Sequence, residues 1–173
     1  MVKVVPYDPA WPTLFAAERS RLLALLPGCI DRVHHIGSTS VPDIAAKPII
    51  DILLEVRRLD EIDGKARAMA TLGYAAKGEY GLPRRRFFTK GEAVRTHHVH
   101  AFATGDSNVE RHLAFRDYLR LHASVAADYA RLKVEVAASC NDDIDVYCVG
   151  KHDFVDRVEQ DALRWRASMP AVS

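Results

Sequence analysis

The sequence lacks any apolar run that approaches the roughly 20 residues needed to span a membrane, and its N-terminus, MVKVVPYDPAWPTLF, has no apolar segment of signal-peptide length. Only three cysteines are present, Cys29, Cys140 and Cys148, and no two of them form a Cys-x-x-Cys pair. Their odd number suits a reducing compartment better than a disulfide framework. These absences predict a cytoplasmic protein with no membrane partner.

An excess of charge of either sign is also lacking, because 24 Lys and Arg residues balance 23 Asp and Glu residues for a formal net charge of +1. The charges are spread along the chain, so nothing drives a general attraction to nucleic acid. We therefore expect a small-molecule partner, and any basic site must be local.

Internal repeats, low-complexity tracts and Gly/Ser-rich linkers are absent as well, so the sequence offers no boundary at which to divide the chain. At 173 residues and 49% hydrophobic composition, the chain is long enough for one domain with a substantial core. We predict a single domain over residues 1–173.

Hydrophobic periodicity predicts a small sheet between helices. The pattern indicates a first helix that stops at Pro27-Gly28, strands at 30–36 and 48–56, a helix at 60–72, and strands at 74–80, 85–90 and 96–103. Three helical patterns then fill the last 65 or so residues, starting near Ser107, Val125 and Ile144. The near-continuous apolar run at 48–56 is typical of a central strand. The predicted fold class is α+β, with a mixed sheet of about five strands.

The turn Gly37-Ser38-Thr39-Ser40 directly follows the strand at 30–36. Glycine allows close approach of the backbone to a ligand, and backbone N–H groups with hydroxyls can cradle phosphate oxygens. The same residue types dominate ordinary turns. The segment is therefore either a phosphate-binding turn or a generic loop.

Asp51 interrupts the apolar run from Ile49 to Leu54. A carboxylate in a covered strand must be paired, hydrogen-bonded or bound to a metal to offset its desolvation. A structural ion pair, for instance with Lys47, is one interpretation and a metal ligand is the other. Strand alternation places Leu53 where a second metal-binding acid would stand, and Glu55 lies roughly 13 Å further along, too far to share one ion.

The densest cluster of titratable residues is Thr96-His97-His98-Val99-His100. On a strand, His98 and His100 share a face and can supply two nitrogens to a metal site that Asp51 completes. Contact with a phosphate or substrate and a purely structural role are the alternatives, because neutral imidazole suits all three.

Basic residues near these motifs are candidates for anion binding. Arg85 and Arg86 offer guanidinium forks for a phosphate, although alternate arginines on a strand face opposite ways and one is expected in solvent. On the predicted helices, Arg116, Lys133 and Lys151 occupy positions that the apolar periodicity assigns to the buried face. Each could reach a cleft, or its stem could snorkel along apolar surface.

These motifs together resemble the GrpB family over essentially the whole chain: 35–42 (HIGSTSVP), 46–52 (AKPIIDI), 97–100 (HHVH) and 115–120 (FRDYLR). The resemblance implies a nucleotidyltransferase-like fold, in which Gly37 and Ser38 match the phosphate-binding turn and Asp51 the first metal-binding acid. The family pattern has a glycine where this chain has Asp43, and another glycine near Arg84. These departures imply that both loops are stiffer or differently shaped in this chain.

The resemblance and the residues lead to three hypotheses. The first is a nucleotidyltransferase that holds Mg²⁺ or Mn²⁺ with Asp51, His98 and His100, and binds a nucleotide or phosphorylated metabolite through Gly37, Ser38, Thr39, Ser40, Lys47, Arg85 and Arg86. The second is a non-catalytic binding module with the same pocket, favoured by the missing second acid. The third is a zinc hydrolase that uses the same three ligands.

Overall fold

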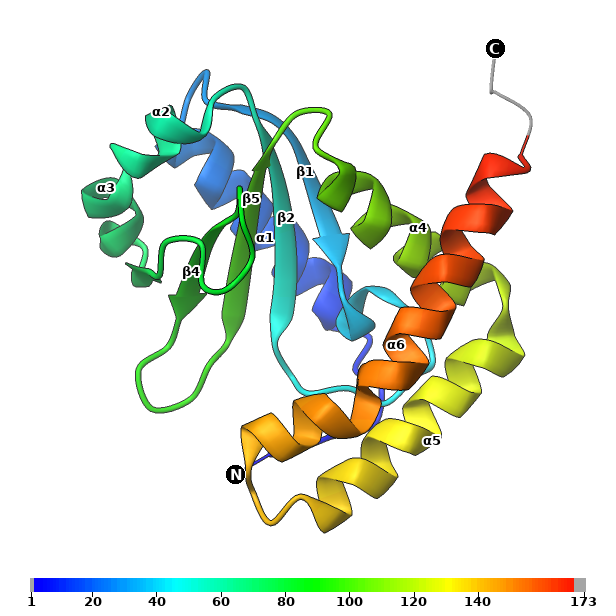
Figure 1. Ribbon diagram of the computed structural model, residues 1–173. Helices are drawn as coiled ribbons and strands as arrows, with labels where there is room; N and C mark the ends of the chain where they lie inside the picture. The colour runs from blue at the N-terminus through cyan, green and yellow to red at the C-terminus, as the bar shows by residue number, and fades with distance from the viewer. Residues whose placement is uncertain (1, 170–173) are drawn as a thin grey trace.

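The computed structural model describes residues 2–169 and shows a five-stranded mixed sheet between helices (Figure 1). The strands are β1 (Ile30–Ile36), β2 (Ile50–Val56), β3 (Tyr74–Ala76), β4 (Arg86–Lys90) and β5 (His97–Ala103). The helices are α1 (Trp11–Leu25), the short α2 (Leu59–Asp63) and α3 (Ala66–Thr71), α4 (Ser107–Leu121), α5 (Ala123–Ser139) and α6 (Ile144–Ala167), with a 3₁₀ turn at Ser38–Ser40. The α+β class predicted from the sequence is confirmed.

The strand order β1-β2-β5-β4-β3 places β2 inside the sheet, as its apolar sequence predicts. β2 pairs with β5 in parallel and with β1 in antiparallel fashion. In this register Asp51 lies opposite His98, and Leu53 opposite His100. Because side chains alternate along strands, all four project from one face of the sheet.

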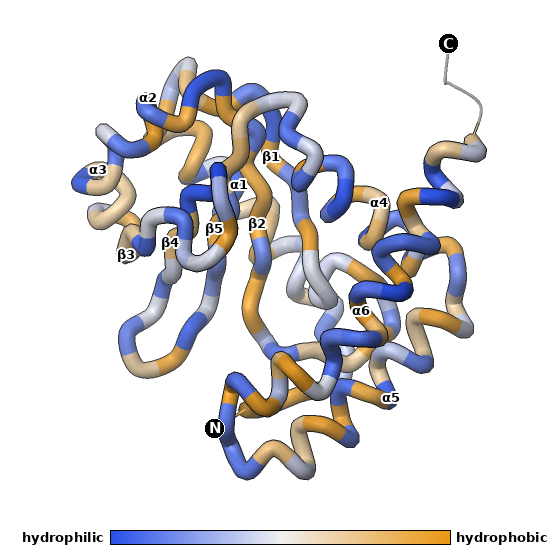
Figure 2. Tube along the Cα trace, viewed as in Figure 1, coloured by the Kyte–Doolittle hydropathy of each residue, from blue (hydrophilic) through white to orange (hydrophobic). Residues whose placement is uncertain are grey.

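The other face carries the main hydrophobic core. Ile52, Leu54 and Val99 pack there with Leu22 of α1 and Met69 of α3. Figure 2 shows hydrophobic residues along β2. This face is closed by α1, α2 and α3, and the functional groups are left to the opposite face.

The second face of the sheet is the one from which Asp51, His98 and His100 project. The C-terminal helices α4, α5 and α6 lie on this side (Figure 1). Val109 of α4 packs with Leu53 and Phe102 at one end of the strands. Further along, α4 and α5 pack together through Leu119 and Tyr129. Within residues 2–169, no helix combines the length and the apolar character that a membrane crossing requires.

Two predicted elements differ from the structure. The helix expected at 60–72 is interrupted at Gly64-Lys65 and forms α2 and α3. The strand expected at 74–80 ends at Ala76, because Gly78 (φ +62°) and Tyr80 (φ +48°) have backbone conformations that are incompatible with a strand.

Asp43 and Arg84 lie in loops whose backbone has the conformation that glycine favours. Asp43 has φ +64° and Arg84 has φ +63°, in the left-handed region that favours glycine. The loops therefore keep a glycine-like backbone although both positions carry side chains. Arg84 is held there by an ion pair between its Nε and Oδ2 of Asp106, at 2.9 Å.

Candidate functional site

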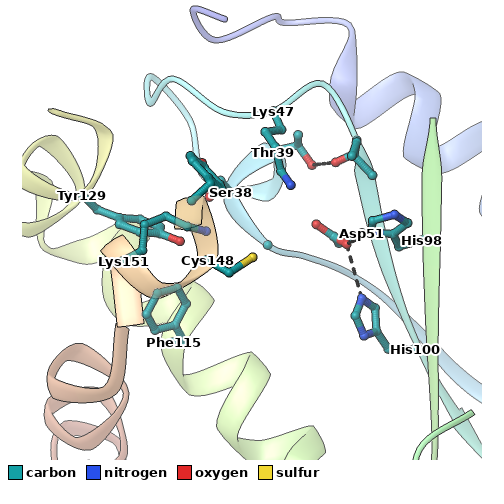
Figure 3. Close-up of a pocket in the computed structure, with 13 residues that line it drawn as sticks. Ser38, Thr39, Lys47, Asp51, His98, His100, Phe115, Tyr129, Cys148 and Lys151 are labelled. Carbon is teal, nitrogen blue, oxygen red and sulfur yellow. Dashed lines mark hydrogen bonds and ion pairs between the residues drawn. The ribbon is translucent and has the colours of Figure 1, made fainter. Parts of the chain in front are cut away.

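Three side chains that the sequence nominated as metal ligands converge on the second face of the sheet. Oδ1 of Asp51 lies 3.3 Å from Nδ1 of His98 and 3.3 Å from Nε2 of His100. One donor atom from each residue lies within 4.8 Å of the others. The parallel pairing of β2 with β5 produces this cluster, because it places the single carboxylate between two imidazoles of the neighbouring strand (Figure 3).

The surroundings keep Asp51 ionised. Burial alone would raise the pKa of its carboxyl group, but the hydrogen-bonding imidazoles of His100 and His98 outweigh burial and hold the pKa well below its usual range. Asp51 therefore presents an anionic oxygen between the two histidines at neutral pH.

The Gly37 turn is pressed against Asp51. A Cβ added at Gly37 would lie 2.6 Å from Oδ2 of Asp51, and Gly37 has φ +70°, a conformation that side chains rarely adopt. Oδ1 thus faces the histidines while Oδ2 lies against the turn. The glycine is required both by its backbone conformation and by the space that Asp51 occupies.

A hydrogen-bonded chain fixes the turn against β2. Burial lowers the pKa of His35 to about 4, so this imidazole is neutral, and it stacks on Phe15 with ring centroids 4.7 Å apart. Nε2 of His35 donates to Oγ1 of Thr39 at 3.0 Å, and Thr39 in turn donates to the carbonyl of Ile49 at 3.3 Å. His35 therefore positions Thr39.

Two arginines of α4 hold the same turn from the other side. Arg116 donates from Nη1 to the carbonyl of His35 at 3.2 Å. Arg120 donates from both Nε and Nη2 to the carbonyl of Ser40, at 2.9 and 2.8 Å. Charge-assisted bonds of this kind are stronger than neutral ones, so α4 clamps the turn in place. Arg116, which the sequence placed on a buried helix face, therefore supports the turn.

The cluster opens into a pocket of about 380 Å³ between the sheet and the C-terminal helices. The lining residues are Gly37, Ser38, Thr39, Lys47, Ile49, Asp51, His98, His100, Phe115, Tyr129, Tyr147, Cys148 and Lys151. Figure 3 shows Asp51 and the two histidines on one side, with Tyr129 and Lys151 across from them. A carboxylate and imidazole wall therefore faces an aromatic and lysine wall.

Three of the nominated residues do not line this pocket. Ser40 points back to the turn and donates from Oγ to the carbonyl of Gly37 at 2.6 Å. Arg85 donates to the carbonyls of Glu79 and Tyr80.

Arg86 pairs with Asp63. In the β4–β5 register Phe87 lies opposite His100, so Arg86, one residue away, projects from the other face of the sheet. The expectation that Arg86 reaches the cleft is therefore wrong on grounds of strand parity.

Several pocket residues were not nominated as site residues from the sequence. Phe115, Tyr129, Tyr147 and Cys148 lie on helices, where apolar residues at helical spacing are typical of core packing. The usable signal was Lys151, a basic residue at a position of the helical period that otherwise faces inward. His112 was also missed: burial lowers its pKa to about 3, and its neutral ring lies 5.6 Å from that of His100, between centroids.

The positions of Leu53 and Glu55 show why a second acid is missing from the pocket. Leu53 is fully buried and packs with Ile36, Phe102 and Val109. Glu55 is bound by His34, with 2.7 Å between Oε1 and Nε2. Asp51 is therefore the single carboxylate among the pocket residues within 2–169.

The donor set fits one divalent ion. Tetrahedral coordination with bonds of 2.0 to 2.1 Å separates neighbouring ligand atoms by about 3.3 Å, which is the spacing of Asp51 from each histidine. Two buried polar atoms on this face, Nδ1 of His100 and Oγ1 of Thr89, have no hydrogen-bond partner in the described part of the chain. Thr89 lies opposite His98 in the sheet. Polar atoms without a hydrogen-bond partner beside the candidate metal-binding residues could be satisfied by a hydrated ion or by a polar small molecule.

Comparisons with known proteins place the chain among close relatives. The family model described as "GrpB protein" matches residues 1–161. UPF0157 protein YqkA of Bacillus subtilis is 44% identical over 165 residues, which cover 95% of this chain and 48% of YqkA. UPF0157 protein PA4798 of Pseudomonas aeruginosa is 39% identical over 168 residues, which cover 94% of this chain and 68% of PA4798. The chain thus spans about half the length of YqkA.

The fold has a solved counterpart. The crystal structure of the conserved protein GrpB from Enterococcus faecalis matches with a TM-score of 0.93 and 40% sequence identity, over 96% of this chain and 100% of that one. The family resemblance drawn from the sequence motifs is therefore confirmed. The family match and the structural match agree over nearly the whole chain, which belongs to the GrpB family.

Proposed function

We propose that the protein is a metal-dependent nucleotidyltransferase that binds a nucleotide or another phosphorylated small molecule in the pocket beside Gly37. The observation that carries this proposal is the placement of Asp51, His98 and His100 within 4.8 Å of one another, in a pocket that Lys47 and Lys151 also line. Three candidate metal ligands and two lysine ammonium groups in one pocket suit a substrate that carries phosphate oxygens.

Asp51, His98 and His100 would hold the ion. Two imidazoles and one carboxylate favour a transition ion such as Mn²⁺ or Zn²⁺ over Mg²⁺, which prefers oxygen ligands. When bound, the ion would neutralise phosphate charge and polarise the phosphorus centre.

The protein's own groups would position the phosphates. Ser38 presents its hydroxyl at the pocket wall, and Gly37 leaves the backbone open to close approach. The Thr39 hydroxyl holds the turn in place through His35 and the Ile49 carbonyl. Lys47 supplies a positive charge on the loop that leads into β2. In nucleotidyl transfer, an acceptor oxygen attacks the α-phosphorus and pyrophosphate leaves. Lys47 is placed to offset the negative charge that develops on the leaving group.

The missing second acid favours a second candidate, a single-ion hydrolase. The second acid that a two-ion mechanism needs on β2 would stand at Leu53, which is sealed in the core below α4. One ion with two imidazole ligands and one carboxylate is the donor set of several zinc hydrolases. The two candidates share the pocket and differ in the product released.

Metal binding is tested first. Purified protein is titrated with MnCl₂, ZnCl₂ and MgCl₂ while its unfolding temperature is followed, and bound metal is counted by elemental analysis. Asp51→Asn, His98→Gln and His100→Gln should each abolish the metal-induced stabilisation. His97→Gln is the matched control, because His97 lies on the same strand and on the opposite face. A stabilisation that survives in all three ligand variants contradicts the proposed site.

Turnover then separates the candidates. Nucleotidyl transfer predicts pyrophosphate release when ATP, GTP, CTP or UTP is supplied with the stabilising metal and a panel of acceptor alcohols, amines and phosphates. The hydrolase predicts inorganic phosphate release from phosphomonoesters without an acceptor. Binding without either product would leave the pocket as that of an accessory module and would refute both catalytic candidates.

A further inference from the structure

Three lysines lie at or near the pocket, and each comes from a different part of the fold. Two of them line the pocket, and the third does not. Lys47 lies on the loop before β2, Lys133 on α5 and Lys151 on α6. Nζ of Lys47 and Nζ of Lys151 lie 5.1 and 4.3 Å from the centroid of the same ring, that of Tyr147. Within residues 2–169, none of the three forms an ion pair with a carboxylate.

Lys133 is the most unusual of the three. Its residue is only 2% exposed, and its Nζ has no hydrogen-bond partner among the described residues. The ammonium group lies 4.4 Å from the ring centroid of Tyr129, a pocket-lining residue. A ring face offsets only part of the cost of removing a charge from water. Lys133 therefore lowers the stability of the chain in this state.

The packing of α5 on α6 explains how Lys133 is enclosed. A Cβ at Gly150 of α6 would lie 2.7 Å from Cγ1 of Val136 on α5, so the two helices approach closely near this point. Lys133 is about one turn before Val136 on α5, and Lys151 directly follows Gly150. The close approach places the ammonium of Lys133 near that of Lys151 rather than in solvent.

The electrostatic consequences agree with this arrangement. Burial and the charge of Lys151 lower the pKa of Lys133 to about 7. Burial also lowers the pKa of Lys151, and the ammonium of Lys47 lowers it further. The repulsion between such like charges is relieved when a polyvalent anion binds between them.

We propose that Lys47, Lys151 and Lys133 form a subsite for two or more linked phosphates, in which α5 and α6 supply the second and third positive charges. This inference deepens the proposed function, because it assigns a diphosphate or triphosphate group rather than a single phosphate to the pocket. A monophosphate carries about two charges near pH 7 and is matched by two lysines, whereas a diphosphate makes use of the third.

Lys151 lies on the helical wall, across from Asp51 and the histidines, whereas Lys47 enters the pocket from the loop before β2 (Figure 3). Lys151 and Lys47 line the pocket directly and would contact phosphate oxygens. Lys133 stands behind Tyr129 and would act through its charge. The arginines nominated from the sequence are engaged elsewhere, Arg85 by backbone carbonyls and Arg86 by Asp63, so the lysines carry this role.

The test uses metal-free protein, so that its outcome does not depend on the metal site. Calorimetric titration with inorganic pyrophosphate and, separately, inorganic phosphate should show tighter binding of pyrophosphate by about tenfold or more. Lys47→Met and Lys151→Met should each weaken pyrophosphate binding by about tenfold, the loss expected when a charge-assisted contact is removed. Lys77→Met, at an exposed position, is the matched control and should leave binding unchanged.

Lys133→Met tests the buried charge. The variant should bind pyrophosphate several-fold more weakly although its unfolding temperature is unchanged or higher, an outcome that a merely structural lysine would not produce. Equal affinity for the two anions, or unchanged pyrophosphate binding in Lys47→Met and Lys151→Met, would overturn the subsite. Asp51→Asn should still bind pyrophosphate without metal, so failure of the metal site and failure of this subsite are separate results.

Discussion

Gly37 and Asp51 are in such close contact that a Cβ at position 37 would lie 2.6 Å from Oδ2 of the carboxylate. The contact joins the turn after β1 to the cluster of Asp51, His98 and His100 on β2 and β5. It makes the shape of the turn and the position of the carboxylate depend on each other.

Gly37→Ala should therefore damage both stability and metal binding. The positive φ alone costs about 1–2 kcal/mol of unfolding free energy, and the Cβ must also displace Asp51 from the histidines. Gly28→Ala is the matched control, because Gly28 has φ +76° and its added Cβ would meet nothing within 4 Å. Chemical denaturation should show losses in both variants, with metal-induced stabilisation lost only in Gly37→Ala. Full metal binding by Gly37→Ala would contradict the coupling.

Leu53→Asp tests whether the second acid of a two-ion site can be restored. Leu53 is fully buried and does not line the pocket, since it packs with Ile36, Phe102 and Val109. Removing the leucine side chain costs about 2–5 kcal/mol, and the unpaired carboxylate adds to this. We expect severe destabilisation with no gain of a second bound ion. Asparagine has about the size of aspartate but no charge, so Leu53→Asn separates the effect of the lost packing from that of the buried charge. A stable Leu53→Asp variant with two ions per chain would show that the pocket extends further than the structure indicates.

The sequence predicted much of the candidate site because strand alternation is a strong constraint. A period of two places His98 and His100 on one face, and a single carboxylate in an apolar run requires a partner. The pairing of β2 with β5, which brings Asp51 to the histidines, is a long-range relationship that the periodicity of each strand does not contain.

The same limitation explains the errors. The face on which Arg86 projects depends on the register between β4 and β5, and the sequence around Arg84-Arg85-Arg86 is compatible with either parity. The aromatic wall of Tyr129 and Tyr147 depends on how α5 and α6 cross the sheet. Apolar spacing predicts that a helix buries one face, but not what that face meets. Lys133 and Lys151 were detectable because charge at buried positions needs an explanation wherever the helix packs.

Glu18 should make stability depend on acid pH. It is fully buried in α1, where Oε1 lies 2.7 Å from Nζ of Lys90 and accepts a hydrogen bond from the Tyr74 hydroxyl at 2.9 Å. Burial would raise the pKa of Glu18, but Lys90, Tyr74 and Arg21 outweigh it and lower the pKa below the ordinary value of 4.5. A lowered native pKa contributes stability above 4.5 that is lost as the pH falls through the native value.

Glu18→Gln should therefore reduce the unfolding free energy by about 3 kcal/mol at pH 7, because Lys90 keeps its buried charge without a carboxylate. The difference between wild type and variant should narrow below pH 4.5. Glu92→Gln, at an exposed loop position, provides the control and should follow the wild type at every pH. A constant difference from pH 7 to pH 3 would show that packing, and not charge, accounts for the effect.

Lys133 should make stability depend on pH in the opposite range. Burial and Lys151 lower its native pKa to about 7, so between pH 7 and its ordinary value of 10.5 the unfolded chain binds a proton that the folded chain releases. By linkage, this group costs most stability at and below pH 7, and the cost decreases as the pH rises toward 10.5. Lys133→Met keeps the length of the stem and removes the charge, so it should stabilise the protein by about 1–4 kcal/mol at pH 7.

Denaturation of wild type and Lys133→Met should be measured at pH 6, 7, 8, 9 and 10. The gain should shrink steadily above pH 7, because the free energy needed to release the proton of Lys133 on folding falls as the pH approaches 10.5. Saturating pyrophosphate should reduce the gain at pH 7 as well, since a bound anion pairs the charge and stabilises the wild type by mass action. A gain that is independent of pH would mean that the pKa of Lys133 is the same in the folded and unfolded chains. The repulsion between like charges that a bound diphosphate would relieve would then be absent, and Lys47 with Lys151 would be left as a site for a single phosphate.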